Sequence, residues 1–286
     1  MCGRYASARK RIELLEEFSV QRDRVAEDLT PDYNVAPTRS VYAVMDREQR
    51  ASDADKSDSA PKKAAARKDA GHEPAAGPPE AGAVARELRV VRWGLVPSWA
   101  KDISIGSRLI NARAETVSEK PSFRRAFARR RCLLPADGYY EWQVLENAGP
   151  RGGKRKQPYF IHRADGGPMA FAGLYELWRD RQFPDGDPDA WLWTATIITT
   201  TAADEVGQIH DRMPMTIAPG SWADWLDPAN SEVSDLQALL VPAADGGLTS
   251  YPVSAEVNSV RHNGPELIKP VPAPLEPGAP LWSDQD

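Results

Sequence analysis

Cysteine and histidine are scarce in this chain, and their scarcity argues against two classes of protein. Only two cysteines and four histidines occur among the 286 residues. Two cysteines far apart in the sequence do not form the disulfide framework of a small secreted domain, so we expect a reduced, cytoplasmic protein. The scattered cysteines and histidines also fail to match a zinc-ligand spacing, so we predict no metal site and no cofactor.

Long apolar runs and a strong positive charge are missing as well. No stretch of about 18 apolar residues could form a membrane-spanning helix, and the first residues lack the charged-then-apolar pattern of a secretory signal. We therefore expect no membrane association. The formal net charge of −5 argues against a protein that coats nucleic acid through bulk charge, although a local basic groove is compatible with it.

One segment, Arg47–Glu87, lacks large apolar residues: it contains no Ile, Leu, Met, Phe, Trp or Tyr. Such a segment cannot bury enough apolar surface to offset the entropy lost on ordering, which predicts a disordered insertion. Strand-like sequences flank it at Ser40–Met45 and Glu87–Pro97. We therefore predict one domain over residues 1–270, with the insertion 47–87 inside a β-hairpin, and a flexible tail over residues 271–286.

The rest of the chain combines many short strand patterns with a few helix patterns. Strands are predicted at Arg131–Trp142, Tyr159–Ala164, Met169–Trp178, Trp191–Thr200 and Leu248–Ser254. Helices are predicted at Arg9–Val20, Ser122–Arg130, Thr200–His210, Ser221–Pro228 and Val233–Pro242. This mixture predicts an α+β fold built on a curved or barrel-like antiparallel sheet with peripheral helices.

The opening MCGRY places a cysteine directly behind the initiator methionine. If Met1 is removed, Cys2 carries a thiol and a free α-amine on neighbouring carbons, with ordinary pKa values of about 8.5 and about 7.7–8.0. With an aldehyde, this pair can form an imine and then a thiazolidine. With an ester or an amide, the thiol alone would attack. The alternative is an incidental cysteine at a chain terminus.

Four further residues carry side chains suited to catalysis or phosphate binding. Asn111 and Arg113 alternate with alanines, so an extended backbone puts both on one face, where they suit a sugar–phosphate ligand. Glu141 lies among aromatic residues, a setting that raises a carboxyl pKa and suits a general acid or base. His210 suits proton transfer near neutral pH. The alternatives are a buried Asn–Arg pair, a solvent-facing glutamate and a structural histidine.

Two segments are candidates for contact with nucleic acid. Trp99 lies in a predicted loop, where an exposed ring can stack on an unpaired base. Ser122–Cys132 holds five arginines in eleven residues. On a helix, Phe123 and Phe127 at i and i+4 would face inward and leave the arginines outside. These arginines form either a solvated face or a rim that follows phosphates.

Seven separated motifs, taken together and in this order, resemble those of the SOS response-associated peptidase (SRAP) family. They are MCGRY, YNVAPT, WGLVPSW, NARAET, CLLPADGYYEW, KQPYFI and IHDRMP. The resemblance runs from Cys2 to about Pro270 and includes the late segments YPVSAEVN and ELIKPV. It implies a mixed α/β fold around a barrel-like antiparallel sheet with a DNA-binding cleft, and covalent capture of abasic sites in single-stranded DNA.

The resemblance also implies a role for each matching residue. Cys2 is similar to the family's nucleophile, which links to the ring-opened sugar aldehyde through a thiazolidine. Asn111, which would hold the abasic sugar, Glu141 and His210 match the other active-site residues. DNA contacts are implied for Arg4, Asn34, Trp99, Arg113 and Arg212.

These roles predict a monomeric enzyme that crosslinks to abasic DNA in the SOS response and associates with the nucleoid during DNA damage. Removal of Met1 by the protein itself and a weak lyase activity are further expectations. The alternatives are a thiol peptidase acting on other proteins and a non-covalent single-stranded DNA-binding module. The sequence departs from the family pattern in its long insertion and in having one tryptophan after Pro97, where some relatives have two.

Overall fold

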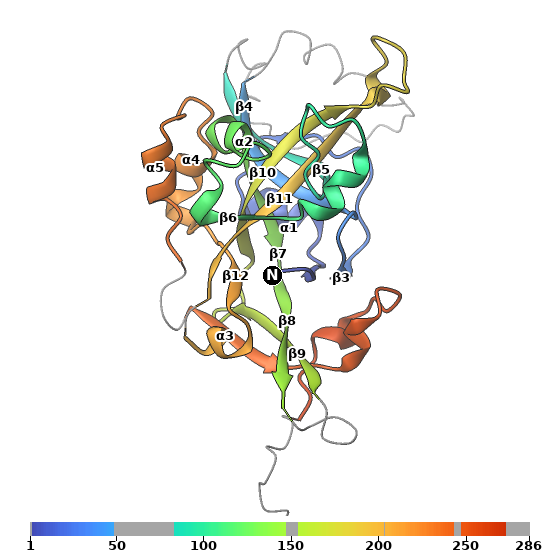
Figure 1. Cartoon of the computed structure of the whole chain (residues 1–286), viewed down its shortest axis with the longest axis vertical. Helices are drawn as coiled ribbons and strands as arrows, with labels where there is room; N and C mark the ends of the chain where they lie inside the picture. The colour runs from blue at the N-terminus through green and yellow to red at the C-terminus, as the bar shows by residue number, and fades with distance from the viewer. Residues whose placement is uncertain (1, 49–82, 147–153, 203, 243–246, 273–286) are drawn as a thin grey trace, which may run out of the picture.

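The computed structural model describes residues 2–48, 83–146, 154–202, 204–242 and 247–272 (Figure 1). Most of the predicted insertion and tail therefore lies outside the described residues. One strand continues to Glu48 and the next begins at Val84, so both strands extend into the segment 47–87 that was predicted to be disordered. Val271, at the start of the predicted tail, donates a backbone hydrogen bond of 2.9 Å to the carbonyl oxygen of Pro252.

Five strands close into a barrel in the order β10–β7–β4–β5–β11, with β11 pairing back to β10 (Figure 1). The β5–β11 pair that closes the barrel is parallel and joins Arg92 to Thr194. The predicted α+β fold on a barrel-like sheet is confirmed, whereas strand patterns do not predict the parallel closure, since they do not reveal which strands pair. The barrel strands are β4 (Ser40–Glu48), β5 (Val84–Trp93), β7 (Arg131–Ala136), β10 (Met169–Arg179) and β11 (Trp191–Thr201).

Three short strands extend the barrel sheet. β2 (Arg22–Asp23) pairs with β5 in parallel, and β6 (Asn111–Arg113) pairs with β11 in parallel. β12 (Arg212–Pro214) pairs with β11 antiparallel, through Thr199, Thr200 and Thr201. The C-terminal half of β11 thus brings β6 and β12 together, although they are far apart in the sequence.

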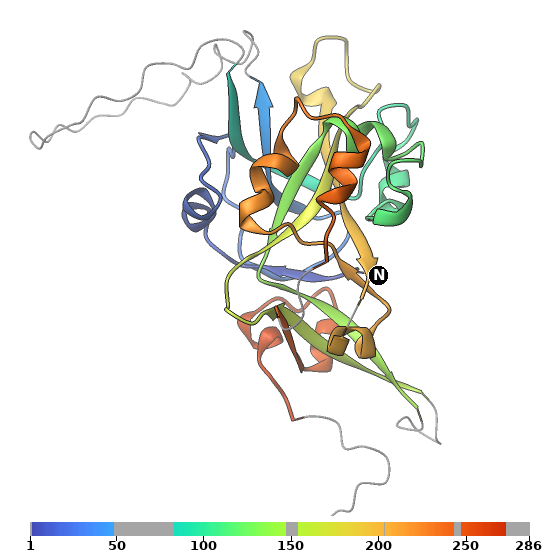
Figure 2. The same ribbon diagram turned by 90° about the vertical axis from the view of Figure 1, so that its left-hand side faces the viewer.

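A second sheet extends below the barrel in the view of Figure 1, and Figure 2 shows it from the side. The predicted strand Arg131–Trp142 is divided at Asp137, so its first half is β7 of the barrel and its second half belongs to this second sheet. In spatial order the strands are β13 (Leu248–Pro252), β9 (Arg155–Arg163), β8 (Gly138–Leu145), β1 (Tyr5–Ser7) and β3 (Asp32–Val35).

The barrel strands have two buried faces, because side chains alternate across a strand. On β4, Val41, Ala43 and Met45 point into an interior cluster that also holds Cys2. Tyr42 and Val44 belong to a second cluster, which the helices cover. The covering helices are α1 (Arg11–Glu17), α2 (Arg124–Arg129), α4 (Trp222–Leu226) and α5 (Val233–Ala238).

A further α-helix and several 3₁₀ helices complete the described chain. Helix α3 (Asp204–Ile209) contributes Val206 and Ile209 to the interior cluster. Within the described ranges, no helix is long and apolar enough to cross a membrane, and no group of three or more histidine, cysteine or acidic residues could hold a metal. The 3₁₀ helices are η2 (Ile103–Arg108), η3 (Ala114–Thr116), η5 (Pro188–Ala190), η6 (Pro219–Ser221), η7 (Ala255–Asn258) and η8 (Pro265–Ile268).

Candidate active site

Cys2 is fully buried, and its backbone is held from two directions. The side-chain amide of Asn111 on β6 donates a hydrogen bond of 2.8 Å to the carbonyl oxygen of Cys2. Two residues further on, the backbone N–H of Tyr140 donates to the carbonyl oxygen of Arg4 at 3.0 Å, which continues the β1–β8 ladder toward the terminus. The position of Cys2 is therefore set by β6 on one side and β8 on the other.

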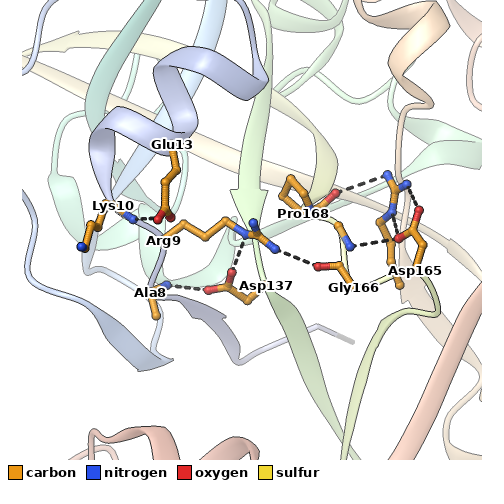
Figure 3. Close-up of polar contacts among 10 residues, drawn as sticks. Ala8, Arg9, Lys10, Glu13, Asp137, Asp165, Gly166 and Pro168 are labelled. Atoms are coloured by element: carbon orange, nitrogen blue, oxygen red, sulfur yellow. Dashed lines mark hydrogen bonds and ion pairs between the residues drawn. The ribbon is translucent and has the colours of Figure 1, made fainter.

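A polar tether holds the other end of β1 (Figure 3). The Asp137 carboxylate, at the junction of β7 and β8, accepts hydrogen bonds from the backbone N–H of Ala8 at 2.6 Å and from Nε of Arg9 at 3.0 Å. Arg9 also donates to the carbonyl oxygen of Gly166 at 2.9 Å, in the turn between β9 and β10. Burial raises the pKa of Asp137, while the contacts from Ala8 and Arg9 oppose that change. The segment from Cys2 to Arg9, which contains β1, is thus fixed at both ends.

The thiol of Cys2 is protonated in this environment. Burial, with the nearby charge of Glu141, raises the pKa of the thiol well above its ordinary value. The sulfur has only a weak contact with the carbonyl oxygen of Arg4, at 4.0 Å. The resting thiol is therefore not a thiolate nucleophile, and a reaction at sulfur requires a group that accepts its proton.

Glu141 is a buried acid with a pKa near neutrality. The alternation along β8 puts Tyr139 and Glu141 on one face and Tyr140 on the other. Glu141 is only 3% exposed. Burial, helped by the negative charge of Asp211, raises the pKa of Glu141 to about 7. A carboxyl group with this pKa can both donate and accept a proton at neutral pH, as its aromatic surroundings in the sequence predict.

His210 lies between Glu141 and solvent. It follows α3, and its Nε2 is 4.0 Å from Oε2 of Glu141. The backbone N–H of Arg212 donates to Nδ1 at 3.0 Å, which keeps Nδ1 an acceptor and places the proton of the neutral ring on Nε2. Burial lowers the pKa of His210, so the neutral ring is favoured at neutral pH. Asp211 also approaches Nδ1, at 2.9 Å, and would pair with the ring only when both nitrogens are protonated.

Two buried polar atoms near Cys2 have no hydrogen-bond partner within the described part of the chain. One is Oδ1 of Asn111, the acceptor atom of the amide that holds Cys2. The other is the hydroxyl of Tyr139, whose pKa is raised well above the ordinary value, mainly by burial. A buried polar atom without a partner is costly, so both atoms are available to a ligand that could satisfy them.

Arg4 and Asn34 form a single network with the C-terminal segment. Nη1 of Arg4 donates to Oδ1 of Asn34 at 2.7 Å and to the carbonyl oxygen of Val257 at 2.8 Å. Asn34 is 3% exposed, and its amide nitrogen donates to the carbonyl oxygens of Ser259 and His262 at 2.9 and 2.8 Å. The side chain of Asn34 is thus occupied within the protein and holds Arg4 in place.

Arg113 and Arg212 differ in their surroundings. Arg113 shares the outward face of β6 with Asn111, is exposed, and makes no side-chain hydrogen bond or salt bridge to any described residue. Arg212 forms a two-point contact with Glu115, at 2.6 and 3.0 Å, and donates to the carbonyl oxygen of Thr199 at 2.7 Å. This contact lowers the pKa of Glu115 and neutralises the charge of Arg212.

Trp99 is exposed on a loop that is held by hydrogen bonds on both sides of it. Its side chain is 54% exposed. Before it, the backbone N–H of Val96 donates to Oγ1 of Thr194 at 2.9 Å. After it, the carbonyl oxygen of Ala100 accepts from the indole of Trp178 at 2.8 Å. Gly94, at φ +118°, permits this loop, because a Cβ there would lie 2.6 Å from the carbonyl oxygen of Gly106.

The structure connects the predicted site residues through several different elements. Contacts link Asn111 to Cys2, and Glu141 to His210. No role was predicted from the sequence for Tyr139, Glu115 or Asp211. The alternation along β8, which places Tyr139 on the face of Glu141, could have identified Tyr139. Nothing in the sequence pairs Glu115 with Arg212, since the two are 97 residues apart.

Comparison with known proteins connects this geometry to a family. Residues 1–260 match the sequence model of the family described as SOS response associated peptidase (SRAP). The abasic site processing protein YoqW of Bacillus subtilis is 36% identical over 269 residues, which cover 94% of this chain and 99% of that protein. The abasic site processing protein HMCES of Gallus gallus is 32% identical over 265 residues, covering 84% of this chain and 66% of that protein.

Solved structures support the same fold. A crystal structure of a protein from Bacteroides thetaiotaomicron superposes with a TM-score of 0.67 at 24% identity, covering 94% of this chain and 100% of that one. A protein from Bordetella bronchiseptica superposes with a TM-score of 0.59 at 23% identity, covering 88% of this chain and 100% of that one. At these identities the likeness concerns the fold alone.

Proposed function

The chain belongs to the SOS response associated peptidase family, and from this membership and the surroundings of Cys2 we propose that it processes abasic sites in single-stranded DNA by linking to them covalently. The observation that carries the proposal is the placement of Cys2 beside Glu141, whose pKa is about 7, with its carbonyl oxygen held by Asn111. Among the relatives, YoqW and HMCES are named abasic site processing proteins.

The reaction begins at the α-amine of Cys2, after Met1 has been removed. An abasic deoxyribose is a masked aldehyde, and proton transfer by Glu141 or His210 assists opening of its ring. The amine then attacks the aldehyde carbon, the carbonyl oxygen takes up protons, and one water leaves to give an imine. The amine reacts before the thiol because the thiol of Cys2 is protonated in its buried position.

The thiol completes the link. The sulfur of Cys2 adds to the imine carbon while its proton passes to the imine nitrogen, which closes a five-membered thiazolidine ring. In total, one carbon–nitrogen and one carbon–sulfur bond replace the carbonyl double bond, and no electrons are gained or lost. Glu141 can accept and return the thiol proton, and His210 connects Glu141 with solvent.

The remaining predicted residues position the DNA. Oδ1 of Asn111, which has no partner in the described ranges, accepts a hydrogen bond from a sugar hydroxyl. Arg4 and Arg113 contact the flanking phosphates, and Arg212 does so once its pairing with Glu115 is shared or broken. Trp99 stacks on a base beside the lesion. Asn34 supports Arg4 rather than touching DNA itself.

Two further activities follow from the same groups. Attack of the Cys2 thiol on the carbonyl carbon of Met1, assisted by Glu141, and hydrolysis of the resulting thioester by water would release Met1 and free the α-amine of Cys2. Loss of the adjacent phosphate from the imine would cleave the strand, which is a weak lyase activity. A general thiol peptidase is less well supported, because such an enzyme needs an accessible thiolate, whereas the thiol of Cys2 is buried and protonated.

The test uses protein without Met1 and a single-stranded oligonucleotide with one abasic site, resolved on a denaturing gel. We expect a shifted band that resists denaturant and is absent with Cys2→Ala. A matched control inserts one glycine before Cys2, which keeps the thiol and displaces the α-amine; it should form no thiazolidine adduct. A wild-type protein that binds this DNA in native conditions but forms no adduct would contradict the covalent mechanism and leave the non-covalent binding module or the thiol peptidase.

A further inference from the structure

Helix α2 borders a hollow whose charged groups all have the same sign. The hollow has a volume of about 320 Å³ and is lined by Arg124, Arg125, Ala128, Arg129 and Arg130. No carboxylate lines it. The chain as a whole has a formal net charge of −5, so this concentration of positive charge is a local feature and not a reflection of composition.

Among the described residues, three of the four arginines have no hydrogen-bond or salt-bridge partner. Arg130 forms a salt bridge of 2.7 Å with Glu176 on β10. Arg124, Arg125 and Arg129 are exposed, and their side chains make no hydrogen bond or salt bridge with any residue in the described ranges. Arg125 and Arg129 are four positions apart, a spacing at which like charges destabilise a helix. The arrangement therefore costs stability in the protein alone, and a polyanion in the hollow would reverse that cost.

The buried residues of α2 orient the helix so that these arginines face solvent. Ala126 and Phe127 are buried in the cluster that covers the barrel, as the i, i+4 pattern of Phe123 and Phe127 predicts. Arg131, directly after the helix, is 3% exposed and donates to the carbonyl oxygens of Phe127 and Trp225 at 2.9 and 2.7 Å. The helix is thus fixed at its C-terminal end, and the three unpaired guanidinium groups are displayed on a rigid support.

The hollow lies within reach of a DNA strand bound at Cys2. Strand β7 leads directly from α2 to the junction with β8, which carries Glu141. Its six residues span about 20 Å at 3.3 Å per residue. Phosphates in one strand of a duplex are spaced about 3.4 Å apart along the axis, and an extended single strand spaces them further apart, so about six nucleotides or fewer would cover this distance. On the other side, residues 114–123 connect α2 to Arg113, and the exposed Lys120 lies between them.

We propose that Arg124, Arg125 and Arg129 bind the phosphodiester backbone of the DNA strand that flanks the lesion, at a site separate from Cys2. This inference rests on the proposed function, because it assigns these arginines to the same DNA. It resolves the two possibilities left by the sequence in favour of a phosphate-contacting rim. Guanidinium groups suit this task, since each presents several donors to phosphate oxygens.

The test measures non-covalent binding of the full chain to undamaged single strands by fluorescence anisotropy, over a range of salt concentrations. A strand of about 20 nucleotides is long enough to contact α2 and the surroundings of Cys2 at the same time. For this strand, we expect the triple variant Arg124→Ala, Arg125→Ala and Arg129→Ala to lower the slope of log affinity against log salt by about 2.

A triple lysine variant is the matched control. The variant with Arg124→Lys, Arg125→Lys and Arg129→Lys keeps the charge and should keep a salt slope close to that of wild type. Arg125→Ala alone should lower the slope by about 0.7, which provides a second measurement if the triple variant is poorly folded. A wild-type slope in the alanine variants, or an equal loss in the lysine variant, would overturn the proposal.

Failure of the proposal for α2 can be distinguished from failure of the covalent mechanism. On a short abasic strand, the alanine triple variant should still form the denaturant-resistant adduct at the wild-type rate, because α2 is not reached. If wild-type protein forms no adduct at all, the covalent mechanism fails. The salt slope on undamaged long strands would still decide whether α2 contacts phosphates.

Discussion

Nε2 of His210 lies 4.0 Å from Oε2 of Glu141, and the two side chains differ sharply in exposure: the Glu141 side chain is 4% exposed and that of His210 is 30% exposed. The pair therefore connects a buried carboxyl group next to Cys2 with bulk water. Because the pKa of Glu141 is raised to about 7, a proton can move in either direction along this path near neutral pH. A reaction that first releases water and then closes a ring through a protonated thiol needs such a path.

The raised pKa of Glu141 makes stability depend on pH. The native state keeps the proton up to about pH 7, whereas an unfolded chain releases it near pH 4.3. Between these values the native state binds more protons, so the free energy of unfolding falls as pH rises, in total by roughly 4 kcal/mol. The Glu141→Gln variant has no titrating carboxyl group at this position, so it lacks this pH-dependent change in the free energy of unfolding. Its stability relative to wild type should therefore increase between about pH 4 and about pH 8, as measured by urea unfolding. Parallel curves would contradict the assignment.

Asn111→Ala should slow adduct formation. It removes the hydrogen bond of 2.8 Å to the carbonyl oxygen of Cys2 and the unpartnered acceptor Oδ1. A hydrogen bond contributes about 0.5–1.5 kcal/mol, so we expect a rate about 2- to 13-fold lower at saturating abasic DNA. Affinity for undamaged DNA is the control and should not change. An unaltered rate would show that β6 does not position Cys2 for the reaction.

Glu115→Gln should strengthen binding to undamaged single-stranded DNA. Glu115 neutralises Arg212 through a two-point contact, and its loss leaves that positive charge available to a phosphate. We expect the slope of log affinity against log salt to steepen by about 0.7. Arg212→Ala should make the slope shallower by a similar amount. If neither variant changes the slope, Arg212 acts only within the protein.

Two adjacent tyrosines should respond in opposite ways to loss of the hydroxyl. The buried hydroxyl of Tyr139 has no partner in the described part of the chain, so Tyr139→Phe should raise the free energy of unfolding by about 1 kcal/mol. The hydroxyl of Tyr140 donates to the carbonyl oxygen of Tyr33 at 2.7 Å, so Tyr140→Phe should lower it by about 1 kcal/mol. Chemical unfolding of both variants measures the difference. Equal destabilisation would mean that the Tyr139 hydroxyl is satisfied within the protein.

Local patterns predicted the parts of the fold and site that depend on backbone period. Alternation placed Asn111 and Arg113 on one face of β6, and Ala112 between them is buried at 1% exposure. The aromatic surroundings of Glu141 indicated a raised pKa, and the structure confirms it. The exposure of Trp99 is confirmed too. In each case the neighbours that decide the outcome lie within a few residues along the chain.

Features that depend on distant partners could not be predicted in this way. The sequence pattern placed the arginines of Ser122–Cys132 on the outside, but Arg131 is 3% exposed because it donates to carbonyl oxygens on α4 and α2. The pairing of Arg212 with Glu115 and the parallel pairing of β5 with β11 are equally long-range. A strand pattern defines a face and not a partner, so these contacts emerge only from the folded chain.

The β4–β5 hairpin provides a place where the protein can be labelled. The proposed chemistry needs a free amine on Cys2, so no tag can be fused before that residue. The hairpin ladder extends to the pair Glu48–Val84, and Trp93, which lies in the cluster of Cys2, is nine residues further along β5. At 3.3 Å per residue, this separates the end of the hairpin from that cluster by about 30 Å. A fluorescent reporter inserted between the two strands would follow the protein in cells while leaving its reactive terminus untouched.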